Sequence, residues 1–356
     1  MPSMRSSTIG VGYLPRGGQA WRSPWADYRA LRDHDPVHHV VDPDRPDADY
    51  YVLSRHADIL AAAVDTGTFS SAQGLTVEYG ELERIGLSET PPLVMLDPPD
   101  HTAFRRLVSR GFTPRQVRDI EPAVREFVVA RIEAMVAGGG GDIVSELFKP
   151  LPSMVVAHYL GVPEADRANF DAWTDAIVAA SSTGGPSAAA DATTEMLGYF
   201  ADLIERRRSE PGDDTVSLLV AAEREDPVDL ISILGYVFTM VTGGNDTTTG
   251  ALGGAVQLLA QHPDQGAALR AEPDLIPGAV EEFLRLTSPV QGLARTVTRD
   301  VELHGVPIPA GRKVLLLFGA GNRDQRRYGP DADDLDVRRA PSQILAFGQG
   351  AHHCLG

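Results

Sequence analysis

Apolar residues recur at helical spacing along most of the chain, and this pattern predicts a mainly helical protein. The longest helix is expected to begin at Asp226–Pro227 and to run to about Gln261, where His262–Pro263 ends it. A helix of about 35 residues is about 50 Å long and crosses a whole domain of this size. Further helices are expected over residues 54–64, 113–136, 150–160, 163–180, 190–208 and 277–286.

Strand patterns are confined to two regions of the chain. A β-rich run covers Tyr50–Leu53, and hairpin-like alternation covers residues 297–317. Residues 71–99 form a long connection whose final prolines do not continue a helix, and residues 181–190 (SSTGGPSAAA) predict a flexible link. The sequence therefore predicts a helical protein with a small β portion. Residues 1–20 resemble a flexible arm, and the part after the hairpin is rich in loops.

Composition limits the class of protein. The 356 residues are 43% hydrophobic, which is enough for a packed core, and the length suggests about two domains or one large domain with lobes. Lys and Arg number 32 against 49 Asp and Glu, so the formal net charge is −17. Nucleic acid and anionic membranes are therefore not expected partners for the whole surface. Without a signal-peptide pattern or a membrane-spanning apolar segment, a cytoplasmic location is expected.

The one cysteine, Cys354, excludes an internal disulfide and a structural zinc site with two or four cysteines. It lies in the segment FGQGAHHCLG at residues 347–356. A dinucleotide fingerprint fails here, because His353 stands where its third glycine is needed. A lone cysteine is most often a small buried hydrophobe. The surrounding glycines, however, permit tight turns that direct backbone N–H groups at the sulfur, and such donors stabilise a metal-bound thiolate.

This segment resembles the haem-ligand signature of the cytochromes P450, F-G-x-G-x-H-x-C-x-G, at every fixed position. The resemblance implies that Cys354 is the axial ligand of the iron in haem b. It also implies that His352 contacts a haem propionate, and that Phe347 and Gly350 belong to the cofactor-binding loop.

A second motif, GGNDTT at residues 243–248, lies midway along the long predicted helix. Glycine and threonine are poor helix formers, so the string predicts either a kink with a packing role or a functional site. It is similar to the P450 motif [AG]-G-x-[DE]-T-[ST]. By that resemblance Gly243 lets the cofactor approach the helix, Thr247 holds iron-bound dioxygen and Asp246 relays protons.

Glu282 and Arg285 share one face of a helix, and in isolation such a pair is worth a few tenths of a kcal/mol. The P450 resemblance implies instead a buried structural pair. A second arginine usually completes it, but the aligned segment PDADDLDV has Asp334 in that place. The alternatives are Arg323, Arg338 or Arg339 as the second arginine, or a direct pair between Asp334 and Arg285.

Two further groups of basic residues match the family by position. His101 and Arg105 lie four apart on one helix face, and with Arg295 they are implied to bind the haem propionates, since a partly buried dianion needs cationic partners. The other group is either a basic patch for an acidic ferredoxin or a set of scattered solvated side chains. Its members are Arg105, Arg106, Arg110, Arg115 and Arg118.

The order of these motifs from about residue 25 onward resembles a bacterial, actinobacterial-type P450. The resemblance implies one P450 domain over residues 1–356, with a large helical lobe and a small β-rich lobe. Family members continue past the cysteine with a helix and β-structure, so the chain is expected to be truncated and to hold haem weakly.

The resemblance also implies the activity. A P450 inserts one oxygen atom of O2 into a hydrophobic small molecule, by hydroxylation or heteroatom dealkylation, with electrons from NAD(P)H delivered through ferredoxin reductase and ferredoxin. Substrate is expected to contact residues 74–94, 237–247 and 289–294, with Tyr79 and Gln291 as polar exceptions. The alternative is a haem protein that binds ligands without turnover. Asp246 and Thr247 favour the enzyme, whereas the missing C-terminal segment favours the alternative.

Overall fold

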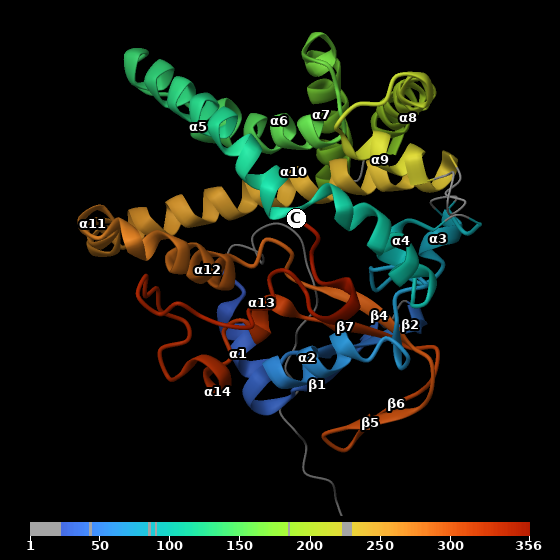
Figure 1. The fold of residues 1–356 in the computed structure, drawn as a ribbon. Coiled ribbons are helices and arrows are strands. Elements are labelled where there is room, and N and C mark those ends of the chain that lie inside the picture. The colour runs from blue at the N-terminus through green and yellow to red at the C-terminus, as the bar shows by residue number, and fades with distance from the viewer. Residues whose placement is uncertain (1–22, 43–44, 85–86, 90, 184–185, 223–229) are drawn as a thin grey trace, which may run out of the picture. The chain divides into compact units, whose positions relative to one another are not determined.

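The computed structural model describes residues 23–356, apart from 43–44, 85–86, 90, 184–185 and 223–229. The chain divides into two compact units (Figure 1). The first consists of Met1–Gly86 and Leu258–Cys354, and the second of Leu87–Gln257 and Leu355–Gly356. The predicted flexible arm at residues 1–20 lies outside the described residues.

A five-stranded sheet forms the centre of the first unit, with the strand order β1-β2-β7-β4-β3. Strands β2 and β7 are parallel, although nearly three quarters of the chain separates them, and the other neighbours are antiparallel. The predicted strand at Tyr50–Leu53 is confirmed as the C-terminal half of β2. The strands are β1 (Val37–Asp42), β2 (Arg45–Leu53), β3 (Phe69–Ser70), β4 (Leu293–Val297) and β7 (Lys313–Leu316).

Alternating residues cover the two faces of this sheet. On one face Val52 and Leu315 pack with Tyr28 and Leu31 of α1 (Trp25–His34). On the other face Leu53, Val314 and Leu316 pack with Ile59 of α2 (His56–Val64). Helix α2 confirms the helix expected at residues 54–64, whereas α1 and β1 were not predicted. Each sheet face is thus buried under one N-terminal helix.

The predicted hairpin is confirmed in part as a separate two-stranded sheet of β5 (Val301–Leu303) and β6 (Val306–Ile308). Its turn uses His304 and Gly305, both with positive φ, as a two-residue hairpin requires. His304 Nε2 lies 2.8 Å from Asp58 Oδ2 on α2, so a hydrogen bond joins the hairpin to this helix.

The second unit is helical, and its core is formed by side chains such as Phe170, Phe200 and Tyr236. Helix α10 is continuous for 32 residues, which confirms the long predicted helix, although its expected start at Asp226 lies outside the described residues. The long helices are α4 (Asp100–Val108), α5 (Pro114–Ala137), α6 (Pro150–Tyr159), α7 (Arg167–Thr183), α8 (Pro186–Ser209), α9 (Thr215–Ala222) and α10 (Leu230–Gln261).

Helix boundaries follow local sequence signals at several points. Helix α5 begins at a capping box formed by Thr113 and Gln116 and ends at Gly138, close to the predicted bounds. The prediction of a flexible link at residues 181–190 is wrong for most of its length, because α7 extends to Thr183 and α8 begins at Pro186. Proline at the first position of a helix favours this early start.

The remaining helical elements are short or belong to the first unit. Helix α12 confirms the helix expected at residues 277–286, and α11 was not predicted. Among the described residues, the helices are each too short or too polar to cross a bilayer. These elements are α3 (Glu81–Arg84), α11 (Pro263–Ala271), α12 (Ile276–Thr287), α13 (Phe318–Gly321), α14 (Gln325–Tyr328), and the 3-10 turns Leu93–Met95 and Gly350–His352.

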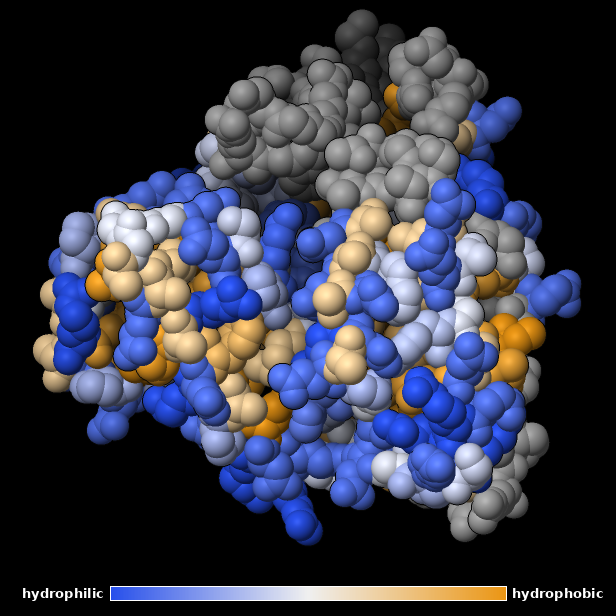
Figure 2. All heavy atoms as spheres, turned by 90° about the horizontal axis from the view of Figure 1, so that it is seen from above, coloured by the Kyte–Doolittle hydropathy of each residue, from blue (hydrophilic) through white to orange (hydrophobic). Residues whose placement is uncertain are grey.

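Figure 2 shows one face on which hydrophobic residues are scattered among predominantly hydrophilic ones. Helix α5 is unusually exposed for its length, since Ile120 is its one buried residue while Val136 is 73% exposed.

Candidate functional site

The predicted site residues divide between the two units. The first unit contains Glu282, Arg285, Arg295, Phe347, Gly350, His352 and Cys354. The second contains His101, Arg105, Gly243, Asp246 and Thr247.

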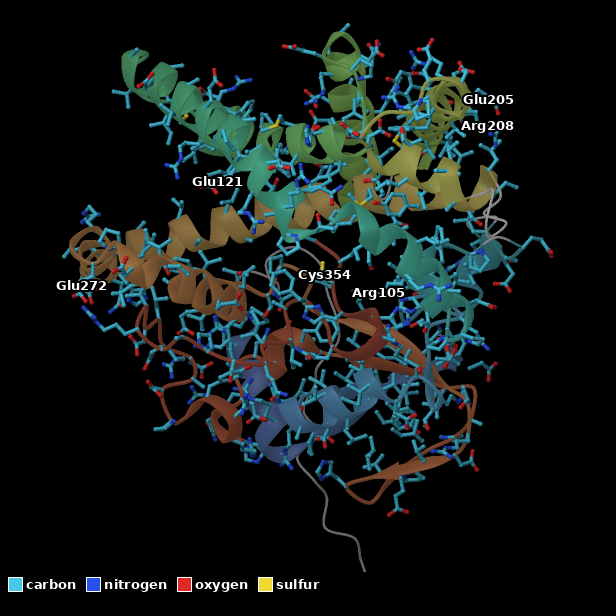
Figure 3. All side chains as sticks on the ribbon, viewed as in Figure 1. Arg105, Glu121, Glu205, Arg208, Glu272 and Cys354 are labelled. Carbon is cyan, nitrogen blue, oxygen red and sulfur yellow. The ribbon has the colours of Figure 1, made fainter. Side chains whose placement is uncertain are left out.

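The cysteine loop is closed by its own backbone. The N–H of Cys354 donates to the carbonyl of Phe347 at 2.7 Å, and the N–H of His353 donates to the carbonyl of Gly350 at 3.1 Å. The Cys354 side chain, labelled in Figure 3, is exposed, which argues against the alternative of a small buried hydrophobe. The loop therefore presents one thiol from a hydrogen-bonded turn.

Glycine is required at two positions of this loop. Gly348 and Gly350 have φ values of 65° and 70°, a region that other residues rarely adopt. A Cβ on Gly350 would also lie 2.9 Å from the carbonyl oxygen of Ala63 and 3.0 Å from Cα of Val64. The loop thus rests directly on the end of α2, which fixes the backbone that leads to Cys354.

Sheet residues beside this loop supply polar partners. His352 Nε2 lies 3.2 Å from the hydroxyl of Ser71, a residue that the sequence did not single out. Ser71 follows β3, where Ser70 pairs with Thr296, the neighbour of Arg295 on β4. Arg295 is 4% exposed. His352 is thus linked through Ser71 to the end of β3, the strand that pairs with the Arg295-bearing strand β4.

Glu282 and Arg285 form a fully buried, bidentate ion pair with distances of 2.7 and 2.8 Å. Arg339 Nε lies 3.1 Å from Glu282 Oε1 and completes the group. The other candidates have different partners: Arg338 pairs with Glu272, and Arg323 donates to the carbonyl of Leu286. The proposed direct pair with Asp334 is wrong, since Arg285 reaches its backbone carbonyl, at 3.4 Å.

In the second unit, α10 continues without a break through the GGNDTT motif. Gly243 is exposed, and a Cβ built on it has no neighbour within 4 Å, so open space adjoins the helix there. The Thr247 hydroxyl donates to the Gly243 carbonyl at 2.7 Å. Partial burial raises the pKa of Asp246 above its ordinary value, and the Lys149 ammonium opposes this shift.

His101 and Arg105 lie on α4 one turn apart, as predicted, with His101 buried and Arg105 half-buried. Of the expected basic patch, Arg106 and Arg118 are exposed. Arg115 is also exposed and lies 3.6 Å from Asp119. The side chain of Arg110 lies outside the described part of the chain.

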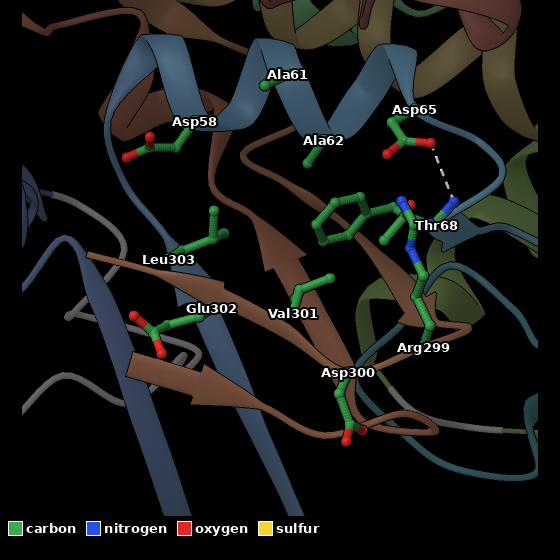
Figure 4. A pocket seen from close by; sticks show the side chains of 11 residues that line it. Asp58, Ala61, Ala62, Asp65, Thr68, Arg299, Asp300, Val301, Glu302 and Leu303 are labelled. Atoms are coloured by element: carbon green, nitrogen blue, oxygen red, sulfur yellow. Dashed lines mark hydrogen bonds between the residues drawn. The ribbon is translucent and has the colours of Figure 1, made fainter. Parts of the chain in front are cut away.

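A surface pocket of about 570 Å³ lies elsewhere in the first unit, between α2 and the β5–β6 hairpin (Figure 4). It is lined by Arg299 and by the carboxylates of Asp58, Asp65, Asp300 and Glu302, and Asp65 accepts a hydrogen bond from the Thr68 N–H at 3.1 Å. None of the residues predicted for the site lines this pocket.

Comparison with known proteins identifies the class. The family model for cytochrome P450 matches residues 186–356. Cytochrome P450 130 of Mycobacterium tuberculosis is 66% identical over 342 residues, which cover 95% of this chain and 84% of the relative. The chain therefore belongs to the cytochrome P450 family and is a P450 monooxygenase.

More distant relatives agree with this assignment. Vitamin D(3) 25-hydroxylase of Pseudonocardia autotrophica is 37% identical over 342 residues, or 95% of this chain and 83% of the relative. The structure of cytochrome P450 CYP109Q5 from Chondromyces apiculatus superposes with a TM-score of 0.84 at 32% identity, over 96% of this chain and 84% of that one. The expected fold class, mainly helical with a small β region, is thereby confirmed.

Membership in the family implies a haem cofactor, and the residues present fit it. A thiol is exposed on a loop that contains two left-handed glycines, and a buried arginine lies on strand β4 of the same unit. Thiolate sulfur is a ligand of haem iron in P450s, and arginine is a strong partner for carboxylates.

Proposed function

We propose that this monooxygenase inserts one oxygen atom of O2 into a hydrophobic small molecule at a haem held by Cys354. The observation that carries the proposal is the exposed thiol of Cys354 at the end of a loop closed by its own backbone. When bound, the haem supplies the iron at which O2 is reduced, and the electron donation of a thiolate ligand favours cleavage of the O–O bond. The N–H groups of Cys354 and His353 donate to backbone carbonyls of the same loop, which fixes the turn that presents the thiol.

Four basic residues are assigned to the haem propionates: His101, Arg105, Arg295 and His352. Arg295 and His101 are 4% and 1% exposed, and buried basic groups of this kind are suited to carboxylates that are themselves partly withdrawn from water. The hydrogen bond between His352 and Ser71 orients the imidazole.

Asp246 and Thr247 are assigned to proton delivery. The Thr247 hydroxyl donates a hydrogen bond to the Gly243 carbonyl. The lone pairs of the hydroxyl oxygen can therefore accept a hydrogen bond from a donor beside the helix. The pKa of Asp246 is raised, so it lies closer to neutral pH than the ordinary pKa of an aspartate. Such a pKa suits a residue that exchanges protons with solvent.

The segments assigned to substrate contact contain two large polar side chains, Gln291 and Tyr79, and the contacts of both favour a hydrophobic substrate. The Gln291 side chain donates to the carbonyls of Thr287 and Ser288 and accepts from the hydroxyl of Tyr28. The Tyr79 hydroxyl donates to the carbonyl of Asp49. Both polar groups are therefore used inside the fold, which leaves apolar contacts to recognise substrate. The name of the Pseudonocardia relative, a vitamin D(3) 25-hydroxylase, agrees with this substrate class.

For the electron source we propose ferredoxin, reduced by NAD(P)H through ferredoxin reductase, in the cytoplasm. Exposed Arg106 and Arg118 offer positive charge on a chain with a net charge of −17, and such local complementarity accelerates encounter with an acidic protein. The alternative function, a haem protein that binds ligands without turnover, has less support. A relative that aligns with nearly the whole chain is named as a hydroxylase.

The test is the spectrum of the reduced protein with carbon monoxide. We expect a strongly red-shifted Soret band, which reports a thiolate ligand, and we expect Cys354→Ala to lose it together with turnover. Cys354→Ser keeps a similar volume and serves as a second variant. A red-shifted band that survives both substitutions would exclude Cys354 as the ligand.

A further inference from the structure

Lys313 is one of only two lysines in the chain, and its side chain is fully buried on β7. Its Nζ donates one hydrogen bond, to the carbonyl of Gln73 at 2.7 Å. Among the described residues, no carboxylate lies within ion-pair distance of this ammonium. Burial lowers the pKa of Lys313, and the more distant charge of Glu81 opposes that shift. A buried cation is costly, so its retention here calls for a role.

The carbonyl that Lys313 binds belongs to residues 73–81, here called the 73–81 segment. The Lys313 backbone contacts the other end of the same segment, since its N–H donates to the Tyr79 hydroxyl at 3.1 Å. Between these points, the carbonyl of Leu75 accepts from the N–H of Ala294 on β4 at 2.7 Å. One residue of β7 thus binds both ends of the segment.

Hydrogen bonds supply most of the contacts that hold the 73–81 segment, because Val77 is its one side chain packed against a hydrophobic core cluster. Only Gly74 and Glu81 are buried within it. Glu81 Oε2 accepts from the N–H and the hydroxyl of Thr76 at 2.8 and 2.7 Å. Gly74 has φ 99°, and a Cβ there would lie 2.3 Å from Glu81 Oε2. A segment held by a few hydrogen bonds opens locally when one of them is lost.

We propose that Lys313 is a positioning residue for substrate selection: its buried ammonium holds the 73–81 segment against the sheet and thereby sets how much of a bound molecule this segment contacts. This inference rests on the proposed function, in which residues 74–94 contact substrate. Without the ammonium, the Gln73 carbonyl has no donor from β7 and the segment opens. Long apolar ligands then lose contacts, whereas a ligand that contacts only the iron does not.

Arg32 offers a matched control for this buried cation. It is 1% exposed on α1, burial lowers its pKa, and its NH1 donates to one backbone carbonyl, that of Ala320, at 2.9 Å. The side-chain hydrogen bond of Arg32 goes to Ala320 and not to the 73–81 segment, so Arg32→Met removes a buried cation from the same unit and leaves the contacts of that segment intact. Lys313→Met keeps an unbranched apolar stem of similar length and removes only the charge and the donor.

The first measurement is amide hydrogen exchange over residues 72–82 in the full chain. We expect exchange in Lys313→Met to be about ten- to hundredfold faster there, while exchange in the β2 and β7 strands stays unchanged. Arg32→Met should leave residues 72–82 as in the unmodified protein. Equal exchange in Lys313→Met and the unmodified chain would overturn the proposal that Lys313 holds the 73–81 segment. The same acceleration in both variants would also overturn it.

The second measurement concerns selection and uses imidazole and 1-octylimidazole, whose shared ring nitrogen ligates haem iron. We expect Lys313→Met to bind imidazole as the unmodified protein does and to bind 1-octylimidazole about tenfold more weakly. An unchanged ratio of the two dissociation constants would refute the role in selection. A wild-type protein without the red-shifted carbonyl band would refute the proposed function instead, and the exchange measurement would still decide whether Lys313 holds the segment.

Discussion

Arg339 Nε lies 3.1 Å from Oε1 of Glu282, a residue 57 positions earlier in the chain. The same carboxylate oxygen accepts from Arg285 NH2 at 2.8 Å, so two guanidinium groups share one fully buried carboxylate. Arg285 also donates to the carbonyls of Asn322 and Ala332 at 2.8 and 2.6 Å. Helix α12 is thereby joined to the loop-rich region that leads to the cysteine loop.

We predict that Arg339→Met lowers the free energy of unfolding by about 2–4 kcal/mol, because it leaves a buried carboxylate with one cation in place of two. Arg338→Met is the control. Its guanidinium pairs with exposed Glu272 (Figure 3) at 2.9 Å, and loss of an exposed pair changes the free energy by about 0.5 kcal/mol or less. Urea denaturation measures both. Equal losses in the two variants would contradict the role assigned to Arg339.

Sequence alone identified the pair of Glu282 and Arg285 but left the second arginine open among three candidates. The reason is physical: residues 329–341 form no long helix or strand, so no periodicity indicates which side chain turns inward. The choice depends on loop contacts such as the hydrogen bond from the Asp336 N–H to Glu282 at 3.2 Å. A contact of this kind is set by the folded loop as a whole.

Gly350 provides a second prediction, because two separate constraints act on it. Its φ of 70° strains any other residue, and a Cβ would meet backbone atoms of α2 at 2.9 and 3.0 Å. The backbone conformation alone costs about 1 kcal/mol of stability when glycine is replaced by alanine. Because of the additional contact with α2, we expect Gly350→Ala also to displace the cysteine loop and to reduce the amount of haem bound.

Gly305 separates these two effects. It has φ 79° in the β5–β6 turn, but a Cβ there would have no neighbour within 4 Å. Gly305→Ala should therefore lower the melting temperature slightly and leave the haem content, measured as the Soret absorbance per protein, unchanged. A similar loss of haem in both variants would show that backbone strain, rather than contact with α2, governs the loop.

The fold itself was predictable where signals are local. Helix α5 was located by the helical spacing of its apolar residues, and the end of α10 by the His262–Pro263 signal. The missed elements depend on partners far away in sequence: β4 is defined by pairing with β7 and with the two residues of β3. Lys313 shows the same limit, since a lysine between strand residues is usually read as exposed, and only the sheet reveals that it is buried.

His56 predicts a dependence of stability on pH. It is 4% exposed on α2, and its Nε2–H donates to the carbonyl of Gln343 at 2.9 Å. Burial lowers the pKa of His56 below its ordinary value, and Arg327 acts in the same direction, whereas the Gln343 carbonyl and Asp324 oppose it. The folded state thus binds fewer protons than the unfolded state, so stability falls as the pH drops below about 6.5.

His56→Gln keeps an N–H donor and removes the titration. We expect the free energy of unfolding to decline less steeply between about pH 6.5 and pH 5 in this variant than in the unmodified protein. His158, whose pKa burial also lowers, contributes a remaining slope in both proteins. Parallel pH profiles of the two proteins would show that His56 does not titrate with folding.

The last prediction separates proton delivery from substrate binding on α10. The Thr247 hydroxyl is bonded within its own helix turn to the Gly243 carbonyl, a contact that adds little to helix stability, so Thr247→Ala should fold and bind substrate normally. If this hydroxyl directs protons, the variant should consume electrons while forming less oxidised product and more hydrogen peroxide. Thr248→Ala removes an exposed hydroxyl one position along and should keep the coupling of the unmodified protein. Asp246→Asn keeps the shape of the side chain but removes its exchangeable carboxyl proton, so it should slow turnover as a whole. Product formed per electron consumed, measured beside the substrate dissociation constant, decides the matter. Unchanged coupling in Thr247→Ala, or a loss explained entirely by weaker substrate binding, would rule out the assigned role.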